Sequence, residues 1–490
     1  MKKRLKTVLK ITATIMIICC IAFILIYLKT TIPSDRELWR IEDNNLSDPI
    51  IVNDLLLFKG DKGDFPNSWC EYIYAVDKNT GKPLWSSENY ATAQYCNHSV
   101  GPVYTAIILL SKGQNVIYVS SSYWSTDDEK EYVLYALSGS SGEVLWKVDD
   151  YAGYPYSLDS LLGYTGTDTN YIYVAGKEGS FSAIDRSTGK PVWKQQVPNV
   201  DFSEDILIEY NDQVVYYYYS GNNTLTAFNA SNGSQIWSVS ESHYARDMMF
   251  SDNTIYLITS SSHSSTSFIT ALDVKTGNQI WELAFESISS SEIIGGEIYI
   301  WAGYGYTKSD LVVVNKGTGE LVWKFNGDYS HDDIRYIIED GVVYIGTKDG
   351  FLFALDSKTG KRIWQTKSPG LPYYFYMEKN TLVIVYEEKY VVAFDMKSGK
   401  QKWFLDIATA SEYYGEFMIA GDGVVYVSSI INRKIYAIDI DTGKELWSWD
   451  LNYPTDRVYY LKALDNDVLY VDQYGRLHGK GWFFAMKTKP

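Results

Sequence analysis

Residues 437–447 read AIDIDTGKELW, and this stretch decides the fold. A small residue opens the frame, an acid follows two positions later, a glycine six positions later and a tryptophan ten positions later. The residues up to Asp439 alternate as in a strand. The acid can accept hydrogen bonds from turn amides and Gly443 tolerates positive φ, so a tight turn is favoured between them. A second run then ends at Trp447, and the stretch predicts a β-hairpin.

The same eleven-residue frame occurs nine times without an insertion. Two further strand-like runs precede each hairpin, as residues 336–338 and 342–346 do in the seventh copy. Successive frame tryptophans lie 39–61 residues apart. This period is typical of the four-stranded blades of a β-propeller.

The two ends of the chain complete one another. Residues 37–40 resemble an outer strand without a hairpin before it, whereas residues 468–471 and 483–486 resemble a blade that lacks its outer strand. Joining them removes exposed sheet edges. The sequence thus predicts an all-β propeller of ten four-stranded antiparallel blades over residues 36–490, closed by the N-terminal strand in the last blade. We expect one tryptophan per blade to dock on the next blade: Trp39, Trp85, Trp146, Trp193, Trp237, Trp281, Trp323, Trp364, Trp403 and Trp447.

A different kind of segment precedes the propeller. Residues 1–10 are rich in Lys and Arg, and residues 11–28 contain no charge. A helix over the second range would span about 27 Å, close to the ~30 Å hydrocarbon core of a bilayer. We expect a cytoplasmic basic tail at 1–10, a transmembrane signal anchor at 11–28 and a linker at 29–35, which puts the propeller on the extracytoplasmic side of the cell membrane. A cleaved secretory signal is the alternative, and it exports the same domain.

Net charge bears on the kind of partner, and the cysteines bear on a disulfide. The 490 residues carry a formal net charge of −16, and the first 29 contain no acid, which leaves 38 basic and 60 acidic residues, a net charge of −22, for the remainder. Such a chain repels phosphate backbones, so nucleic acid is not an expected partner. Cys70 and Cys96 lie beyond the predicted anchor. An exported pair can form a disulfide, and two buried free thiols are the alternative.

The repeated frame resembles the tryptophan-docking repeat of the pyrroloquinoline-quinone-like (PQQ-like) propeller superfamily. That superfamily includes quinoprotein alcohol dehydrogenases and the propeller lipoprotein of the outer-membrane β-barrel assembly machinery, and the resemblance covers residues 36–490. For the dehydrogenases it implies a disulfide between adjacent cysteines over the quinone and a calcium ion held by Glu, Asn and Asp. The adjacent cysteines here are Cys19 and Cys20, inside the predicted anchor. The resemblance therefore implies the non-enzymatic branch, with no cofactor expected.

No catalytic, cofactor-binding or metal-binding residue is predicted, because hydrolase, zinc and phosphate-loop motifs are missing from the sequence. The run 439–445 resembles a calcium loop, but it coincides with the repeated turn. Recognition is expected where the repeats differ, on the first strand of each blade and the loop before it. The candidate channel-end binding face comprises Asp205, Arg246, Asp247, Asp333, Arg335, Tyr373, Tyr374, Tyr413, Tyr414, Arg457 and Tyr459.

Tyrosine combines a flat apolar face with a hydroxyl group and is frequent at interfaces. We therefore expect a protein-interaction scaffold or ligand-sensing module whose channel-end face binds a polypeptide or a saccharide. The alternative for the face itself is that these tyrosines fill a wide central channel or pack inside the blades. For the function, the alternatives are a PQQ- and calcium-dependent alcohol or sugar dehydrogenase and a saccharide-active enzyme with paired carboxylates.

Overall fold

The computed structural model describes most of the predicted propeller. The described residues are 36–43, 49–62, 70–87, 104–110, 115–124, 130–149, 170–176, 179–197, 206–261, 266–303, 308–330, 334–386, 390–407, 418–429, 432–450, 457–475 and 481–488. Within them, no helix has the length and apolar character needed to cross a membrane. Outside them lie the predicted tail, anchor and linker (1–35), and Cys96, Asp205, Asp333, Tyr413 and Tyr414.

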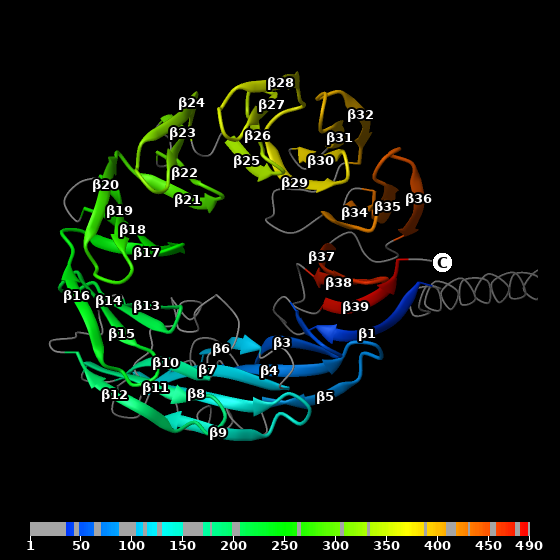
Figure 1. Ribbon diagram of the computed structural model, residues 1–490. Helices are drawn as coiled ribbons and strands as arrows, with labels where there is room; N and C mark the ends of the chain where they lie inside the picture. Colours follow the sequence, from blue (N-terminus) through cyan, green and yellow to red (C-terminus); the bar gives the residue numbers. More distant parts are fainter. Residues whose placement is uncertain are drawn as a thin grey trace, which may run out of the picture. The chain divides into compact units, whose positions relative to one another are not determined.

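The fold is an all-β propeller of ten antiparallel sheets, as predicted (Figure 1). The described residues fall into two compact units. The larger unit comprises residues 46–76 and 83–372, and the smaller comprises residues 77–82 and 373–490 with the N-terminal segment up to residue 45. Nine sheets have four strands, and β10–β12 have three in the described part of the chain.

The larger unit holds the first seven sheets, which follow the chain order. Their strands are β2(Ile50–Val52), β3(Leu55–Lys62), β4(Cys70–Asp77) and β5(Pro83–Ser86); β6(Tyr104–Leu110), β7(Val116–Trp124), β8(Lys130–Ser138) and β9(Val144–Asp149); β10(Tyr171–Gly176), β11(Ser180–Asp185) and β12(Pro191–Gln196); β13(Ile206–Asn211), β14(Val214–Tyr219), β15(Thr224–Asn229) and β16(Gln235–Ser240); β17(Tyr244–Ser251), β18(Thr254–Ser260), β19(Ser267–Asp273) and β20(Gln279–Phe285); β21(Ile288–Ile294), β22(Glu297–Ala302), β23(Lys308–Asn315) and β24(Leu321–Ser330); β25(Ile334–Glu339), β26(Val342–Thr347), β27(Phe351–Asp356) and β28(Arg362–Lys367).

The smaller unit holds three sheets, and one of them joins the two ends of the chain. Its strands are β29(Pro372–Glu378), β30(Thr381–Tyr386), β31(Tyr390–Asp395) and β32(Gln401–Asp406); β33(Met418–Gly421), β34(Val424–Ser429), β35(Lys434–Asp439) and β36(Glu445–Asp450); and β37(Arg457–Asp465), β38(Val468–Gly475), β39(Gly481–Lys487) and β1(Glu37–Asp43). In the last sheet β1 pairs antiparallel with β39, so the predicted composite blade is confirmed.

A row of three side chains organises the blade cores. In the fourth sheet Tyr216 of β14 faces Ala227 of β15, which in turn faces Trp237 of β16. Because the alanine is small, the tyrosine and tryptophan rings meet over it, with centroids 5.9 Å apart. Corresponding Tyr–Trp pairs in seven other sheets have centroid separations of 5.8–6.1 Å. The tyrosine run 216–219 is buried throughout, at 0–3% exposure, as packing on both faces of a sandwiched sheet requires.

Each frame tryptophan with a described partner contacts the next blade. The indole Nε1 of nine of them donates a hydrogen bond of 2.7–3.2 Å to the backbone carbonyl of the residue that follows the frame acid or its equivalent. The frame glycine lies against the ring, and at Gly233 (φ +71°) a Cβ atom would come within 2.5 Å of Trp193. Any larger residue would push the two blades apart. The repeated residues are therefore used in joining blades.

Candidate functional site

The first strands of the larger unit carry the charged part of the predicted binding face. Strands β13, β17, β21 and β25 lie on the inner side of this unit, opposite the outer strands β16, β20, β24 and β28 (Figure 1). Arg246 and Asp247 of β17 are both exposed. The register of β17 shifts between Ala245 and Asp247, so Arg246 is a bulged residue. A bulge re-aims its side chain out of the pleat, and the Arg246 guanidinium donates a 3.3 Å hydrogen bond to Ser260 Oγ.

Burial perturbs the carboxyl groups of these inner strands. Burial, followed by the negative charge of Asp247, raises the pKa of Glu209 on β13 to about 8. Burial also raises the pKa of Glu292 on β21, although a hydrogen bond with Tyr336 partly offsets the effect. Glu209 is therefore protonated at neutral pH beside an exposed carboxylate. Two neighbouring strands thus present a hydrogen-bond donor, the protonated Glu209, and an acceptor, the Asp247 carboxylate.

Aromatic side chains continue the same face on β25. Tyr336 stacks on Trp301, with centroids 5.2 Å apart and an interplanar angle of 16°, and its hydroxyl lies 3.4 Å from Ser290 Oγ. Arg335, the predicted residue on this strand, is half-buried and donates a 2.7 Å hydrogen bond to the carbonyl of Ile334. Glu209 and Tyr336 were not among the predicted site residues. Their environment depends on burial between blades, which strand alternation alone does not reveal.

The smaller unit carries the tyrosine part of the predicted face. Tyr373 and Tyr374 are consecutive on β29, the first strand of its sheet, and remain 46% and 36% exposed. Both rings are therefore open to solvent rather than enclosed in a blade core. Arg457 and Tyr459 lie on β37, which is also the first strand of its sheet. The two units thus present two separate sets of candidate residues.

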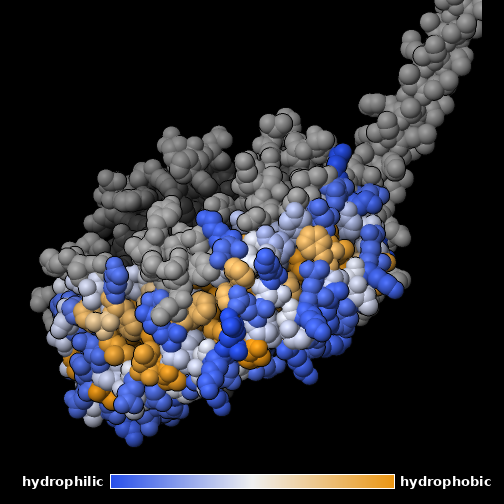
Figure 2. Space-filling view, turned by 90° about the horizontal axis from the view of Figure 1, so that it is seen from above, coloured by the Kyte–Doolittle hydropathy of each residue, from blue (hydrophilic) through white to orange (hydrophobic). Residues whose placement is uncertain are grey.

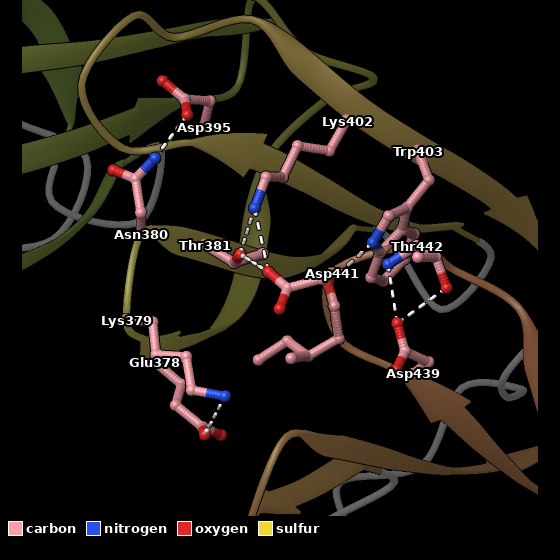
Figure 3. A network of polar contacts seen from close by, with 11 residues as sticks. Glu378, Lys379, Asn380, Thr381, Asp395, Lys402, Trp403, Asp439, Asp441 and Thr442 are labelled. Carbon is pink, nitrogen blue, oxygen red and sulfur yellow. Dashed lines mark hydrogen bonds and ion pairs between the residues drawn. The ribbon is translucent and has the colours of Figure 1, made fainter.

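A polar network joins two neighbouring blades of the smaller unit (Figure 3). Lys402 Nζ donates to Thr381 Oγ1 (2.5 Å) and to Asp441 Oδ1 (3.0 Å), and the Thr381 hydroxyl donates to the same carboxylate (2.9 Å). These contacts hold the pKa of Asp441 below its usual value. Asp439 accepts hydrogen bonds from the Thr442 amide (2.8 Å) and hydroxyl (2.6 Å). The calcium-loop-like run therefore forms the repeated turn and an interblade contact.

The outer strands expose an aliphatic residue at a repeated position that lies outside the predicted binding face. In all ten sheets the register shifts at the residue immediately before the docking tryptophan, which makes this residue a β-bulge. It is Lys402 in one blade and an aliphatic residue, 39–53% exposed, in the others: Leu38, Leu84, Leu145, Val192, Ile236, Ile280, Val322, Ile363 and Leu446. Figure 2 shows apolar patches among polar side chains on one face of the molecule.

The described residues do not fit the calcium site of a quinoprotein dehydrogenase. Among them, no group of three or more His, Cys, Asp and Glu side chains is placed to hold a metal ion. Cys19 and Cys20 lie outside the described residues, and so does Cys96, while Cys70 begins β4. No reaction step is therefore assigned to a quinone or to calcium.

Comparison with known proteins places the chain in a family. The family model described as "Outer membrane protein assembly factor BamB", a PQQ-type repeat, matches residues 129–366, 307–448 and 371–479. The chain belongs to this family. The expected relationship to PQQ-like propellers is confirmed.

Individual relatives of the family are distant. BamB from Yersinia pestis is 23% identical over 320 residues, covering 60% of this chain and 71% of that protein. A quinohemoprotein alcohol dehydrogenase (ADH IIB) from Pseudomonas putida is 36% identical over 77 residues, covering 13% of this chain and only 11% of that enzyme. The crystal structure of BamB from Moraxella catarrhalis is similar with a TM-score of 0.38 and 17% identity, over 66% of this chain and 93% of that one.

Proposed function

We propose that this chain is a membrane-anchored, extracytoplasmic propeller that acts as a scaffold for a polypeptide partner. The observation that carries the proposal is the exposed Tyr373–Tyr374 pair on a first strand of the smaller unit. The docking contacts use the repeated residues, so the residues that vary between blades are left for recognition. Tyrosine pairs of this kind supply contact area at a small cost in conformational entropy. The family description, an assembly factor for outer membrane proteins, supports a protein partner.

The test is photo-crosslinking in cells followed by binding with purified components. A photoreactive amino acid at position 374 should capture a defined protein, which is then identified and purified. The double variant Tyr373→Ala/Tyr374→Ala should weaken its binding at least tenfold, about 1.4 kcal/mol. The control is Phe404→Ala, because Phe404 is 43% exposed on the outer strand β32 of the same sheet. Equal affinity of the double variant and the control would overturn the proposal.

A saccharide-active enzyme is a second candidate, and the carboxyl pair of the larger unit favours it. Glu209 keeps its proton at neutral pH near the exposed Asp247, and glycosidases pair a protonated acid with a carboxylate. Release of reducing sugar from a panel of polysaccharides, abolished by Glu209→Gln and by Asp247→Asn, would support this candidate. Saturable binding of PQQ with Ca²⁺ would favour the dehydrogenase alternative over both.

A further inference from the structure

The repeated docking contact is altered at one place in the smaller unit. Trp403 is typical: a Cβ atom on Gly443 of the next hairpin turn would come within 2.5 Å of its ring. Trp447 docks on the composite blade instead, where β39 and β1 come from opposite ends of the chain. No hairpin turn joins these two strands, so no frame glycine lies over Trp447. β39 and β1 lie side by side in the same sheet (Figure 1).

Trp447 makes the usual docking hydrogen bond, but its ring lacks the contact with a frame glycine. Its Nε1 donates to the carbonyl of Thr488 at 2.9 Å, as in the other blades. Its side chain is only partly buried, like that of Trp281, whereas the eight other docking tryptophans are 7–9% exposed. The guanidinium of Arg36 lies 4.3 Å from the ring centroid, a cation–π distance. One side chain thus replaces part of the missing turn.

A cavity of about 290 Å³ lies beside this tryptophan. We call it the closure pocket. Val424, Leu446, Trp447 and Leu464 contribute its apolar walls, and Asp422 and Asp467 contribute exposed carboxylates. Its volume falls just under the roughly 300–1,000 Å³ of pockets for small-molecule ligands. It therefore suits one large side chain better than a multi-ring cofactor.

The charges around the closure pocket favour a basic partner. Asp422 and Asp467 are its acids and Arg36 is its single base among the described lining residues, in a chain whose formal net charge is −16. Side chains that fill well-packed pockets supply much of the binding energy of an interface, and charges of opposite sign across it add specificity and speed association.

We propose that the closure pocket binds a polypeptide segment that inserts one large apolar side chain beside Trp447 and sets a basic side chain against Asp422 and Asp467. This site goes beyond the proposed function, because neither Tyr373 nor Tyr374 is among the residues that line it. If the closure pocket binds no peptide, the proposal for Tyr373 and Tyr374 is unaffected.

The test uses the full-length chain and short labelled peptides as probes. A fluorescein-labelled Gly-Ser-Lys-Trp-Arg-Gly peptide is titrated with protein and followed by fluorescence anisotropy. We expect saturable binding, at least tenfold weaker for Gly-Ser-Glu-Trp-Glu-Gly and for Gly-Ser-Lys-Ala-Arg-Gly. Absence of saturable binding, or equal binding of the three peptides, would overturn the proposal.

A pair of tryptophan substitutions locates the binding. Leu446→Trp should fill the closure pocket and weaken binding of the Lys-Trp-Arg peptide at least tenfold. Leu145→Trp is the matched control, because Leu145 occupies the same bulged position in another blade and is also 53% exposed. We expect less than a twofold effect from the control, with melting temperatures of both variants monitored. Equal effects of the two substitutions would place the peptide elsewhere and overturn the proposal.

A second pair of substitutions tests the charge. Asp422 and Asp340 each open a D-G-V-V-Y run, have positive φ (+53° and +47°) and are exposed, but only Asp422 lines the pocket. Asp422→Lys should weaken binding of the Lys-Trp-Arg peptide and strengthen binding of the Glu-Trp-Glu peptide. Asp340→Lys should change neither by more than about twofold, a free energy near 0.4 kcal/mol. The same response from both variants would show only the effect of overall charge and would overturn the assignment.

Discussion

At the scale of single residues, the frame acid stabilises its turn as an ionised acceptor. Asp273 Oδ1 accepts hydrogen bonds from the amides of Lys275 (3.1 Å) and Thr276 (2.9 Å) and from the Thr276 hydroxyl (2.8 Å). The Thr276 hydroxyl bond is the main cause of a pKa below the usual value. The pKa values of Asp77, Asp185, Asp356 and Asp395 are lowered in the same way.

This geometry predicts different outcomes for two substitutions of Asp273. Asparagine keeps an acceptor oxygen, as Asn229 and Asn315 do in two natural copies of the turn. Asp273→Asn should therefore cost less than Asp273→Ala, which should cost about 1 kcal/mol. Since the folded pKa is lowered, the carboxylate stabilises the protein above its ordinary pKa near 4, and this stabilisation disappears as the pH falls through the lower folded value. Urea unfolding at pH 7 and pH 3 measures the stabilities of the two variants and their pH dependence. An Asn variant as unstable as the Ala variant at pH 7 would contradict the role of the acceptor oxygen.

At the scale of elements, Lys402 replaces the exposed aliphatic residue of other blades with an interblade ion pair. The pair is partly exposed, with 24% of the lysine and 51% of the aspartate side chain accessible. Coupling between Lys402 and Asp441 should thus be about 0.3–1 kcal/mol. We expect Lys402→Leu, which restores the usual residue type, to lower stability at pH 7 and to lose this effect as the pH falls through the lowered pKa of Asp441. A double-mutant cycle with Asp441→Asn measures the coupling, and a coupling of zero at pH 7 would contradict the assignment.

The limits of sequence-based prediction also appear at the scale of elements. The hairpin turn and docking tryptophan were predictable because the frame has fixed spacing. In eight sheets a tyrosine from an earlier strand packs against the docking tryptophan. The segment that connects this strand to the frame varies in length: Tyr173 precedes Ala183 by 10 residues, whereas Tyr118 precedes Ala136 by 18. A search at fixed spacing misses such a partner. The closure pocket is still harder to predict, because Arg36 and Trp447 meet only through pairing of the chain's two ends.

At the scale of the whole molecule, one residue of the N-terminal strand secures the composite blade. The Trp39 ring packs on Tyr470 and Phe483, with centroids 6.1 and 6.2 Å away, and its Nε1 donates to the Lys78 carbonyl at 3.0 Å. Trp193 is equally buried, at 8% exposure, but lies in a blade whose strands are continuous in sequence. The two tryptophans therefore separate the effect of lost packing from the effect of weakened closure.

We expect Trp39→Ala and Trp193→Ala each to cost about 3–5 kcal/mol through the cavity left behind. Only Trp39→Ala should also release β1, because no hairpin turn tethers that strand to β39. Release would expose the edge of β39, and unpaired strand edges drive self-association. Urea midpoints should therefore fall alike, while sedimentation velocity should show oligomers that increase with concentration for Trp39→Ala alone. Monomers for both variants at every concentration would mean that β1 holds its place without the tryptophan.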